Sequence, residues 1–169
     1  MTGTVFFRGI AEESLPWHED ISRTALANAH LREIVRRLLT EGARCFHTNL
    51  QTAADVFFTQ TILQYKSVFP NSRLEICLPY PIDTHPDLLS AADAVTVFDN
   101  EPENLDFAVA QVDVRLVEKT DIAVIMPLES MPRDASSVLI SRMARQKGIE
   151  VIFYSDEGIY RTKARRLQA

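Results

Sequence analysis

The chain has 169 residues and a net charge of −5 at neutral pH, with 46% hydrophobic and 24% charged residues. These values are typical of one globular domain with its own core. No apolar run approaches the roughly 20 residues of a membrane span, and no basic segment followed by an apolar stretch opens the chain, so we expect neither a membrane span nor a signal peptide. Cys45 and Cys77 stand in apolar runs without metal-ligand spacing, which favours a reduced, cytoplasmic protein and predicts no metal site.

Strands and helices alternate in the first half of the chain. Apolar runs predict strands at residues 4–9, 43–48 and 74–78. Helical spacing of apolar residues predicts a helix at 21–41, and Gly42 follows it where a C-terminal cap belongs. A second helix is predicted at about 53–68, because Thr52 and Asp55 have the spacing of a capping box.

The alternation continues in the second half. The capping spacing at 84–87 predicts a short helix to about residue 92, and a longer helix is predicted at 105–120. Ser136 or Ser137 is expected to cap a third helix that reaches Lys147. Strands are predicted at 94–98, 121–126 and 150–154. The order predicts a single domain, 1–169, with a three-layer α/β/α Rossmann-like fold, a mainly parallel sheet of about six strands, and a core at about 4–155.

The C-terminal residues 158–169 form a basic segment. Arg161, Lys163, Arg165 and Arg166 lie there, so the rest of the chain carries −9. We interpret this segment as a solvated tail or short terminal helix. The alternative is a contact with RNA, DNA or an acidic partner.

The segment 44–55 has the order of a nucleotide site, because a short strand meets a polar turn and a helix starts directly after it. In parallel α/β sheets, ligands bind at the carboxyl ends of strands, where helix N-termini present free N–H groups. Phosphate-binding turns usually contain glycine, and this turn has none.

Two short motifs carry a resemblance to a known family. The first strand ends in Arg8-Gly9-Ile10-Ala11, where the family has a Thr-Gly-His-Arg type turn. The second runs into residues 48–55, where the family has Ser-Gly-Met-Ala-x-Gly-x-Asp; Asn49 and Ala53 replace the glycines and Asp55 is kept. Over residues 4–155 the chain resembles the SLOG superfamily, which includes DprA and the LOG phosphoribohydrolases, and it is most similar to the small YpsA-like bacterial proteins.

The resemblance implies a nucleotide-binding scaffold with altered phosphate contacts. Val112-Asp113 stands where the family has an Arg-Asn pair, and Ala135-Ser136-Ser137 replaces a Gly-Gly-Thr turn. The LOG signature Pro-Gly-Gly-x-Gly-Thr-x-x-Glu has no counterpart, so phosphoribohydrolase activity is not expected. Nucleic acid is not expected as a partner, because the chain is acidic and has one tryptophan.

Each candidate ligand-binding residue has a structural alternative. Arg8 is expected to contact an anion, or else to pair with Asp55 or Asp99 and close an empty site. Asp55 is expected to bind a ribose or a water, or to act only in the capping box. The remaining candidates are expected to donate to a ligand or to serve only as helix caps and turn residues: Gly9, Thr48, Asn49, Gln51, Ser136 and Ser137.

No set of residues in the sequence assembles a reaction. His47 is expected to be packed rather than catalytic, neither cysteine has a recognisable catalytic partner, and Asp134 is expected to cap its own loop near the crevice. The leading hypothesis is a non-catalytic SLOG-like domain that binds a nucleotide-derived or small anionic ligand, with the cofactor left open. The alternatives are an enzyme acting on a nucleotide or nucleoside phosphate, and a structural or partner-binding module with no small ligand that forms a dimer, a homo-oligomer, through an apolar helix face.

Overall fold

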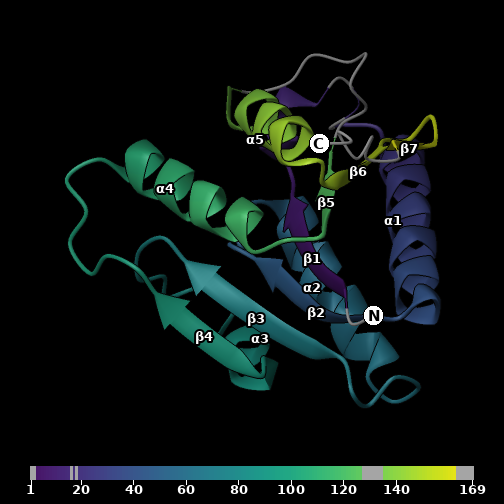
Figure 1. Ribbon diagram of the computed structural model, residues 1–169, viewed down its shortest axis with the longest axis horizontal. Coiled ribbons are helices and arrows are strands. Elements are labelled where there is room, and N and C mark those ends of the chain that lie inside the picture. Colours follow the sequence, from purple (N-terminus) through teal and green to yellow (C-terminus); the bar gives the residue numbers. More distant parts are fainter. Residues whose placement is uncertain (1–2, 16, 18, 127–134, 163–169) are drawn as a thin grey trace.

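The computed structural model describes residues 3–15, 17, 19–126 and 135–162, and at 135 and 136 it describes the backbone alone. Seven strands form one sheet in the order β4-β3-β2-β1-β5-β6-β7 (Figure 1). The first six strands run parallel, and β7 is antiparallel to β6. The strands are β1 (Gly3–Arg8), β2 (Ala43–Thr48), β3 (Arg73–Leu78), β4 (Ala94–Val97), β5 (Ile122–Ile125), β6 (Glu150–Tyr154) and β7 (Ile159–Thr162).

Helices cover both faces of this sheet, which confirms the predicted three-layer, Rossmann-like architecture (Figure 1). On one face α1 and α2 pack together, and on the other α4 packs against α5. The helices are the 3₁₀ turn η1 (Glu12–Ser14), α1 (Ile21–Glu41), α2 (Ala53–Tyr65), α3 (Pro86–Ala91), α4 (Leu105–Glu118) and α5 (Ala135–Lys147). None of the helices among the described residues is long and apolar enough to cross a membrane.

The two faces of the sheet carry separate hydrophobic clusters. Under α1 and α2, Phe7 stacks on Phe58 with ring centroids 4.6 Å apart. Under α4 and α5, Phe6 and Phe153 are fully buried. Because side chains alternate along a strand, the neighbours Phe6 and Phe7 reach opposite cores, and this is the pattern that continuous apolar runs predict for a doubly covered strand.

Several helix boundaries follow the predicted signals. α1 has the predicted bounds, and Gly42 ends it with a φ of 107°, a conformation that glycine adopts without strain. At α2 the capping box is present, because the Thr52 hydroxyl accepts the Asp55 N–H and the Asp55 carboxylate accepts the Thr52 N–H. α2 ends at Tyr65, three residues before the predicted end, and turns follow it.

Three predictions were wrong. The residue that precedes α3 is His85, with a φ of 54° and no side-chain cap bond, so the capping spacing that starts at Thr84 is not used. Since α5 starts at Ala135, Ser136 and Ser137 lie inside its first turn rather than at its cap. The expected tail begins with strand β7, and Arg161 on it bonds Glu41 and Glu150, so this charge is neutralised within the fold. The predicted loop 127–134, including Asp134, and residues 163–169 lie outside the described residues.

Candidate functional site

The carboxyl ends of β1 and β2 meet the start of α2, as the sequence predicted. Gly9 packs so closely on this start that an added Cβ would lie 2.4 Å from Thr52 Oγ1 and 2.8 Å from Ala54 Cβ. Packing against α2 therefore favours glycine at residue 9, because the Cβ of any other residue would overlap Thr52 and Ala54 unless the start of α2 shifts.

Asp55 accepts hydrogen bonds from three backbone N–H groups at this junction. Its Oδ1 accepts the Gly9 N–H at 3.0 Å, and its Oδ2 accepts those of Gln51 and Thr52 at 2.8 and 2.9 Å. The side chain is fully buried. Burial raises the pKa of Asp55, while Arg8 and these three N–H groups oppose the rise. The capping role expected for Asp55 is confirmed. Its carboxylate accepts backbone N–H groups of the turn, so these groups are already hydrogen-bonded within the protein.

Arg8 pairs with a residue that the sequence did not suggest for it. Its Nε lies 3.4 Å from Asp113 Oδ2 on α4, and the exposed fractions of the two side chains are 7% and 1%. Asn49 Nδ2 donates to the other Asp113 oxygen at 2.7 Å. Asp55 and Asp99 were the internal partners expected for Arg8, and the partner in this ion pair is Asp113 instead.

The other candidates also bond within the fold. Thr48 Oγ1 accepts the Leu50 N–H at 3.2 Å. The Gln51 side chain donates to the Asn49 carbonyl at 3.0 Å and accepts the Tyr80 hydroxyl at 2.9 Å. Ser137 is fully buried in the first turn of α5. The structure thus brings Arg8, Gly9, Thr48, Asn49, Gln51 and Asp55 together, and the hydrogen bonds and ion pair described above join them to one another and to Asp113, Leu50 and Tyr80.

Two hollows flank the first turn of α2, and they share Ala53 and Val56. The first has a volume of about 210 Å³ and lies between α1, α2 and the segment after β1. The second, of about 470 Å³, lies beside Tyr80 and Ile82 after β3. Among the described residues, no arginine or lysine lines either hollow.

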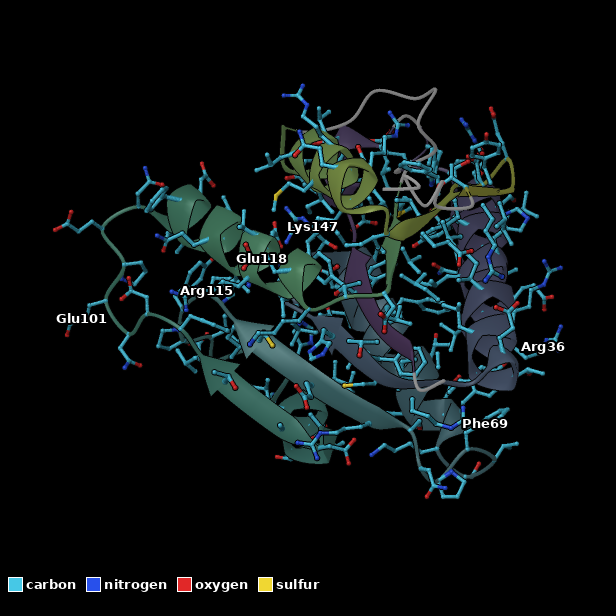
Figure 2. All side chains as sticks on the ribbon, in the orientation of Figure 1. Arg36, Phe69, Glu101, Arg115, Glu118 and Lys147 are labelled. Carbon is cyan, nitrogen blue, oxygen red and sulfur yellow. The ribbon has the colours of Figure 1, made fainter. Side chains whose placement is uncertain are left out.

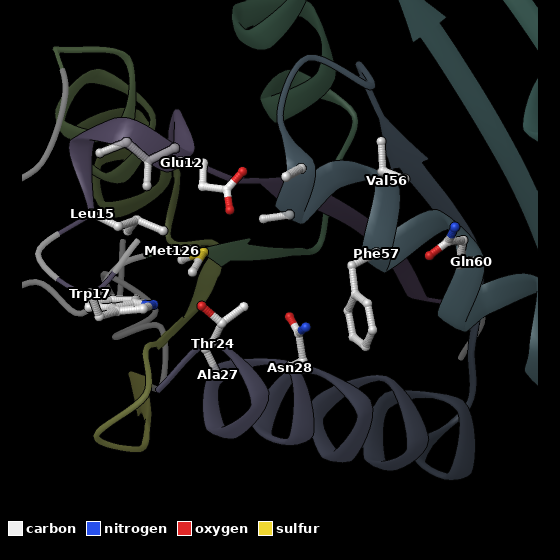
Figure 3. A pocket seen from close by; sticks show the side chains of 13 residues that line it. Glu12, Leu15, Trp17, Thr24, Ala27, Asn28, Val56, Phe57, Gln60 and Met126 are labelled. Carbon is white, nitrogen blue, oxygen red and sulfur yellow. The ribbon is translucent and has the colours of Figure 1, made fainter. Parts of the chain in front are cut away.

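The first hollow, which we call the α1–α2 cavity, combines apolar walls with amide and hydroxyl groups. Figure 3 shows Thr24 and Asn28 pointing into it from α1, with Phe57 and Gln60 on α2. Leu15, Trp17 and Met126 form its other side. The sequence analysis did not identify these residues, because they come from four separate segments and none of them forms a local motif.

The start of α2 offers two unused donors to this cavity. Ala53 and Ala54 line it and are the first two residues of the helix. Within the described part of the chain, no acceptor bonds their backbone N–H groups, whereas those of Thr52 and Asp55 are used in the capping box. Such N–H groups at a helix start favour an electron-rich oxygen.

A second polar cluster lies under the opposite face of the sheet. Cys45, His47 and Glu75 place potential metal-ligand atoms within 4.8 Å of one another. His47 is buried, as predicted, but it is not isolated. The sequence analysis missed the cluster because the residues come from two strands, and only the pairing of β2 with β3 brings them together.

Comparisons with known proteins place the fold without naming a family. No family model and no curated protein matches the sequence. DNA processing protein A from Helicobacter pylori, a structure solved for its single-stranded DNA binding mode, is 15% identical over 88% of this chain, with a TM-score of 0.56. This chain spans 63% of that protein's length. The Chlamydomonas rheinhardtii Moco carrier protein is 10% identical over 91% of this chain and 76% of its own, with a TM-score of 0.53.

At these identities the similarity concerns the fold alone. The first of these structures gives no support to the prediction that nucleic acid is not a partner, and that prediction remains untested. The similarity to the YpsA-like proteins also stays a prediction. What the two structures establish is that this chain has a Rossmann-like α/β fold.

Proposed function

We propose that this protein is a non-catalytic domain that binds a small nucleotide-derived ligand in the α1–α2 cavity. The observation that carries the proposal is the position of this cavity. It is lined by Ile10, two residues after β1, and by Met126, directly after β5. The strand order reverses between β1 and β5, and ligands of open α/β sheets bind at such a switch point.

The lining of the cavity suits a flat ring with polar edges. Ile10, Trp17 and Phe57 offer apolar surface for a base. Asn28 and Gln60 can hydrogen-bond the edge of that base, because each side chain carries both a donor and an acceptor. The free N–H groups of Ala53 and Ala54 suit a phosphate or ribose oxygen at the start of α2.

The proposal that the domain is non-catalytic rests on the charged groups beside the cavity, which bond to other groups of the protein. Arg8 and Asp113 pair with each other, and Asp55 bonds three backbone N–H groups. Glu12 is the one carboxylate among the described residues that line the cavity. A general acid–base mechanism needs a titratable group held within hydrogen-bond distance of a reacting atom, and Glu12 is exposed on a short 3₁₀ turn.

Thermal unfolding with a panel of nucleosides, nucleotides and signalling nucleotides tests this proposal. A ligand at 100 times its dissociation constant adds about 2.7 kcal/mol of stability, which raises the midpoint clearly. We expect Asn28→Ala and Gln60→Ala to abolish the rise. Gln64→Ala is the matched control, because Gln64 lies one turn further along α2 and does not line the cavity.

Three results would overturn the proposal. The first is a panel in which no compound raises the midpoint. The second is a rise that survives both cavity substitutions and is lost in Tyr80→Phe, which would place the ligand in the second hollow. The third is turnover of a bound nucleotide, measured by chromatography of the mixture, that Glu12→Gln removes; that result would favour the enzyme.

One further observation favours self-association as a second function. Among the large apolar side chains that remain exposed, several lie on the edge strand β4, directly after it, and at the start of α4: Val95, Val97, Phe98, Leu105 and Phe107. Leu105, at the start of α4, is 53% exposed. An unprotected edge strand beside apolar side chains favours contact with another chain.

Light scattering after size exclusion tests this second proposal. We expect an oligomer that Phe107→Glu converts to a monomer. Leu139→Glu is the control, since Leu139 is also exposed but lies on α5. A wild-type monomer at high concentration would exclude a homo-oligomer through this surface.

A further inference from the structure

Three metal-binding residue types lie on one face of the paired strands β2 and β3. Cys45 and His47 are two residues apart on β2, so their side chains leave the sheet on the same face. Glu75 on β3 is the register partner of His47. The next residue on this face of β3, Cys77, belongs to the hydrophobic cluster under α4 and α5. The group therefore lies on the face opposite the α1–α2 cavity.

The three side chains lie close enough to close around one ion. Cys45 Sγ is 3.4 Å from His47 Nε2, Glu75 Oε2 is 3.4 Å from His47 Nδ1, and one ligand atom from each residue can be taken so that all three lie within 4.8 Å of one another. A tetrahedral zinc site binds one ring nitrogen and places its ligand atoms roughly 3.3–3.5 Å apart, so the side chains need to close by up to roughly 1.5 Å around the ion. The His47–Glu75 distance is long for a hydrogen bond, whose usual limit is about 3.2 Å.

The charges of the cluster also suit a divalent ion. A thiolate and a carboxylate supply two negative charges, which balance one Zn²⁺. Arg73 Nε bonds Glu75 Oε1 at 2.6 Å and so orients the carboxylate while Oε2 stays directed toward His47.

The geometry points to a zinc site formed by Cys45, His47 and Glu75, with a fourth position open to water. Water can reach the fourth position, because Cys45 is only partly buried and 28% of the Glu75 side chain is exposed to solvent. Binding replaces the proton of the Cys45 thiol by a sulfur–zinc bond, and this proton passes to solvent. The mixed sulfur, nitrogen and oxygen set favours Zn²⁺ over Mg²⁺ and Ca²⁺, which take oxygen ligands.

Cys77 provides an internal control for this site. Its Sγ lies 4.0 Å from His47 Nδ1, so it also contacts the imidazole. Cys77 lies two residues beyond Glu75, whereas Cys45 lies two residues before His47, so the two sulfur atoms approach the imidazole from opposite directions along the strands.

The test uses the untagged full chain after removal of metal by a chelator. Titration with Zn²⁺ against a chromophoric chelator gives the stoichiometry and affinity. Co²⁺ reports the ligands, because coordinated thiolate produces a charge-transfer band in the near ultraviolet. We expect one ion per chain and a thiolate–cobalt band that Cys45→Ser abolishes and Cys77→Ser retains.

Glu75→Gln is the second variant, chosen because its partly exposed position lets the chain fold. It should weaken Zn²⁺ binding by at least about 10-fold, the lower end of what the loss of even an outer-shell partner costs. Circular dichroism checks that each variant is folded. The inference is overturned if the wild type binds no stoichiometric Zn²⁺, if the cobalt band survives Cys45→Ser, or if Glu75→Gln binds as tightly as the wild type.

Discussion

Arg8 Nε lies 3.4 Å from Asp113 Oδ2, and this buried pair joins the carboxyl end of β1 to α4. Asn49 at the end of β2 donates to the same carboxylate at 2.7 Å. The ends of β1 and β2 and helix α4 are therefore held together at the carboxyl ends of the strands, where ligands of open α/β sheets bind. The arginine that the sequence singled out for an anion is engaged by a carboxylate of the protein itself.

Replacing Asp113 should destabilise the protein strongly. Asp113→Ala leaves the Arg8 guanidinium buried without its carboxylate, and breaking a buried ion pair in this way typically costs about 3–5 kcal/mol. Urea unfolding followed by circular dichroism measures the loss. A cost below about 1 kcal/mol would show that the pair contributes little to the folded state.

The double variant Arg8→Met, Asp113→Leu, compared with its two single variants, measures the interaction between the two side chains. An apolar pair of similar volume often replaces a buried ion pair without loss. We expect the double variant to be more stable than Asp113→Ala, with a coupling free energy of about 0.5–3 kcal/mol between the two sites. Additive effects of the single substitutions would contradict a direct interaction.

Gly9→Ala should destabilise the junction between β1 and α2. The added Cβ would lie 2.4 Å from Thr52 Oγ1, so the start of α2 must shift, and overpacking of this kind costs about 1–3 kcal/mol. Gly3→Ala is the matched control on the same strand, because its Cβ would be 3.8 Å from the nearest atom, Ala43 Cα. Equal unfolding midpoints for the two variants would contradict this explanation.

Local signals in the sequence predicted most of the fold. Helical spacing and Gly42 predicted both ends of α1, and the apolar runs predicted β2 and β6 with the observed bounds. β7 was missed because Ile159–Thr162 has no apolar run of its own. This strand is specified by its pairing with β6 and by the ion pairs of Arg161, which depend on the folded structure.

The sequence predicted where the candidate site lies, but it did not predict which residues bond to one another there. The capping box placed Thr52 and Asp55 correctly, because it depends on residues three apart. The partner of Arg8 was not predictable, since Asp113 comes from a helix far along the chain. The Cys45, His47 and Glu75 cluster was missed for a similar reason, because the register of β2 with β3 is not visible in either strand alone.

Asp93 should be important for the attachment of β4. Its Oδ2 accepts the Leu74 N–H at 2.7 Å and the Lys66 ammonium at 2.5 Å, so it links β4 to β3 and to the turn after α2. We expect Asp93→Ala to cost about 1–2 kcal/mol in urea unfolding, as loss of hydrogen bonds to a charged group does. Asp87→Ala, on the exposed first turn of α3, is the control and should change stability by less than about 0.5 kcal/mol.

Arg161→Ala should loosen β7 at the edge of the sheet. Arg161 forms two hydrogen bonds with the Glu41 carboxylate, at 2.8 and 2.6 Å, and a third with Glu150, so it connects β7 to α1 and β6. The side chains are partly exposed, and we expect a loss of about 0.5–1 kcal/mol. Arg36→Ala is the control, because Arg36 lies on α1 (Figure 2) and its ion pair is with Glu33 on the same helix, so its loss should cost less.

The loss of unfolding free energy caused by Arg161→Ala should become smaller as the pH falls. The hydrogen bond from Arg161 holds the pKa of Glu41 below its ordinary value of 4.5, against a smaller opposing effect of burial. The unfolded chain therefore binds the proton first as pH falls, so the stabilisation is complete above about pH 4.5 and decreases as pH falls through the folded-state pKa. Urea unfolding of wild type and variant between about pH 7 and pH 3 should show the two free energies of unfolding converging at acid pH. A difference that stays constant over this range would show that Arg161 supports β7 through packing rather than through its charge.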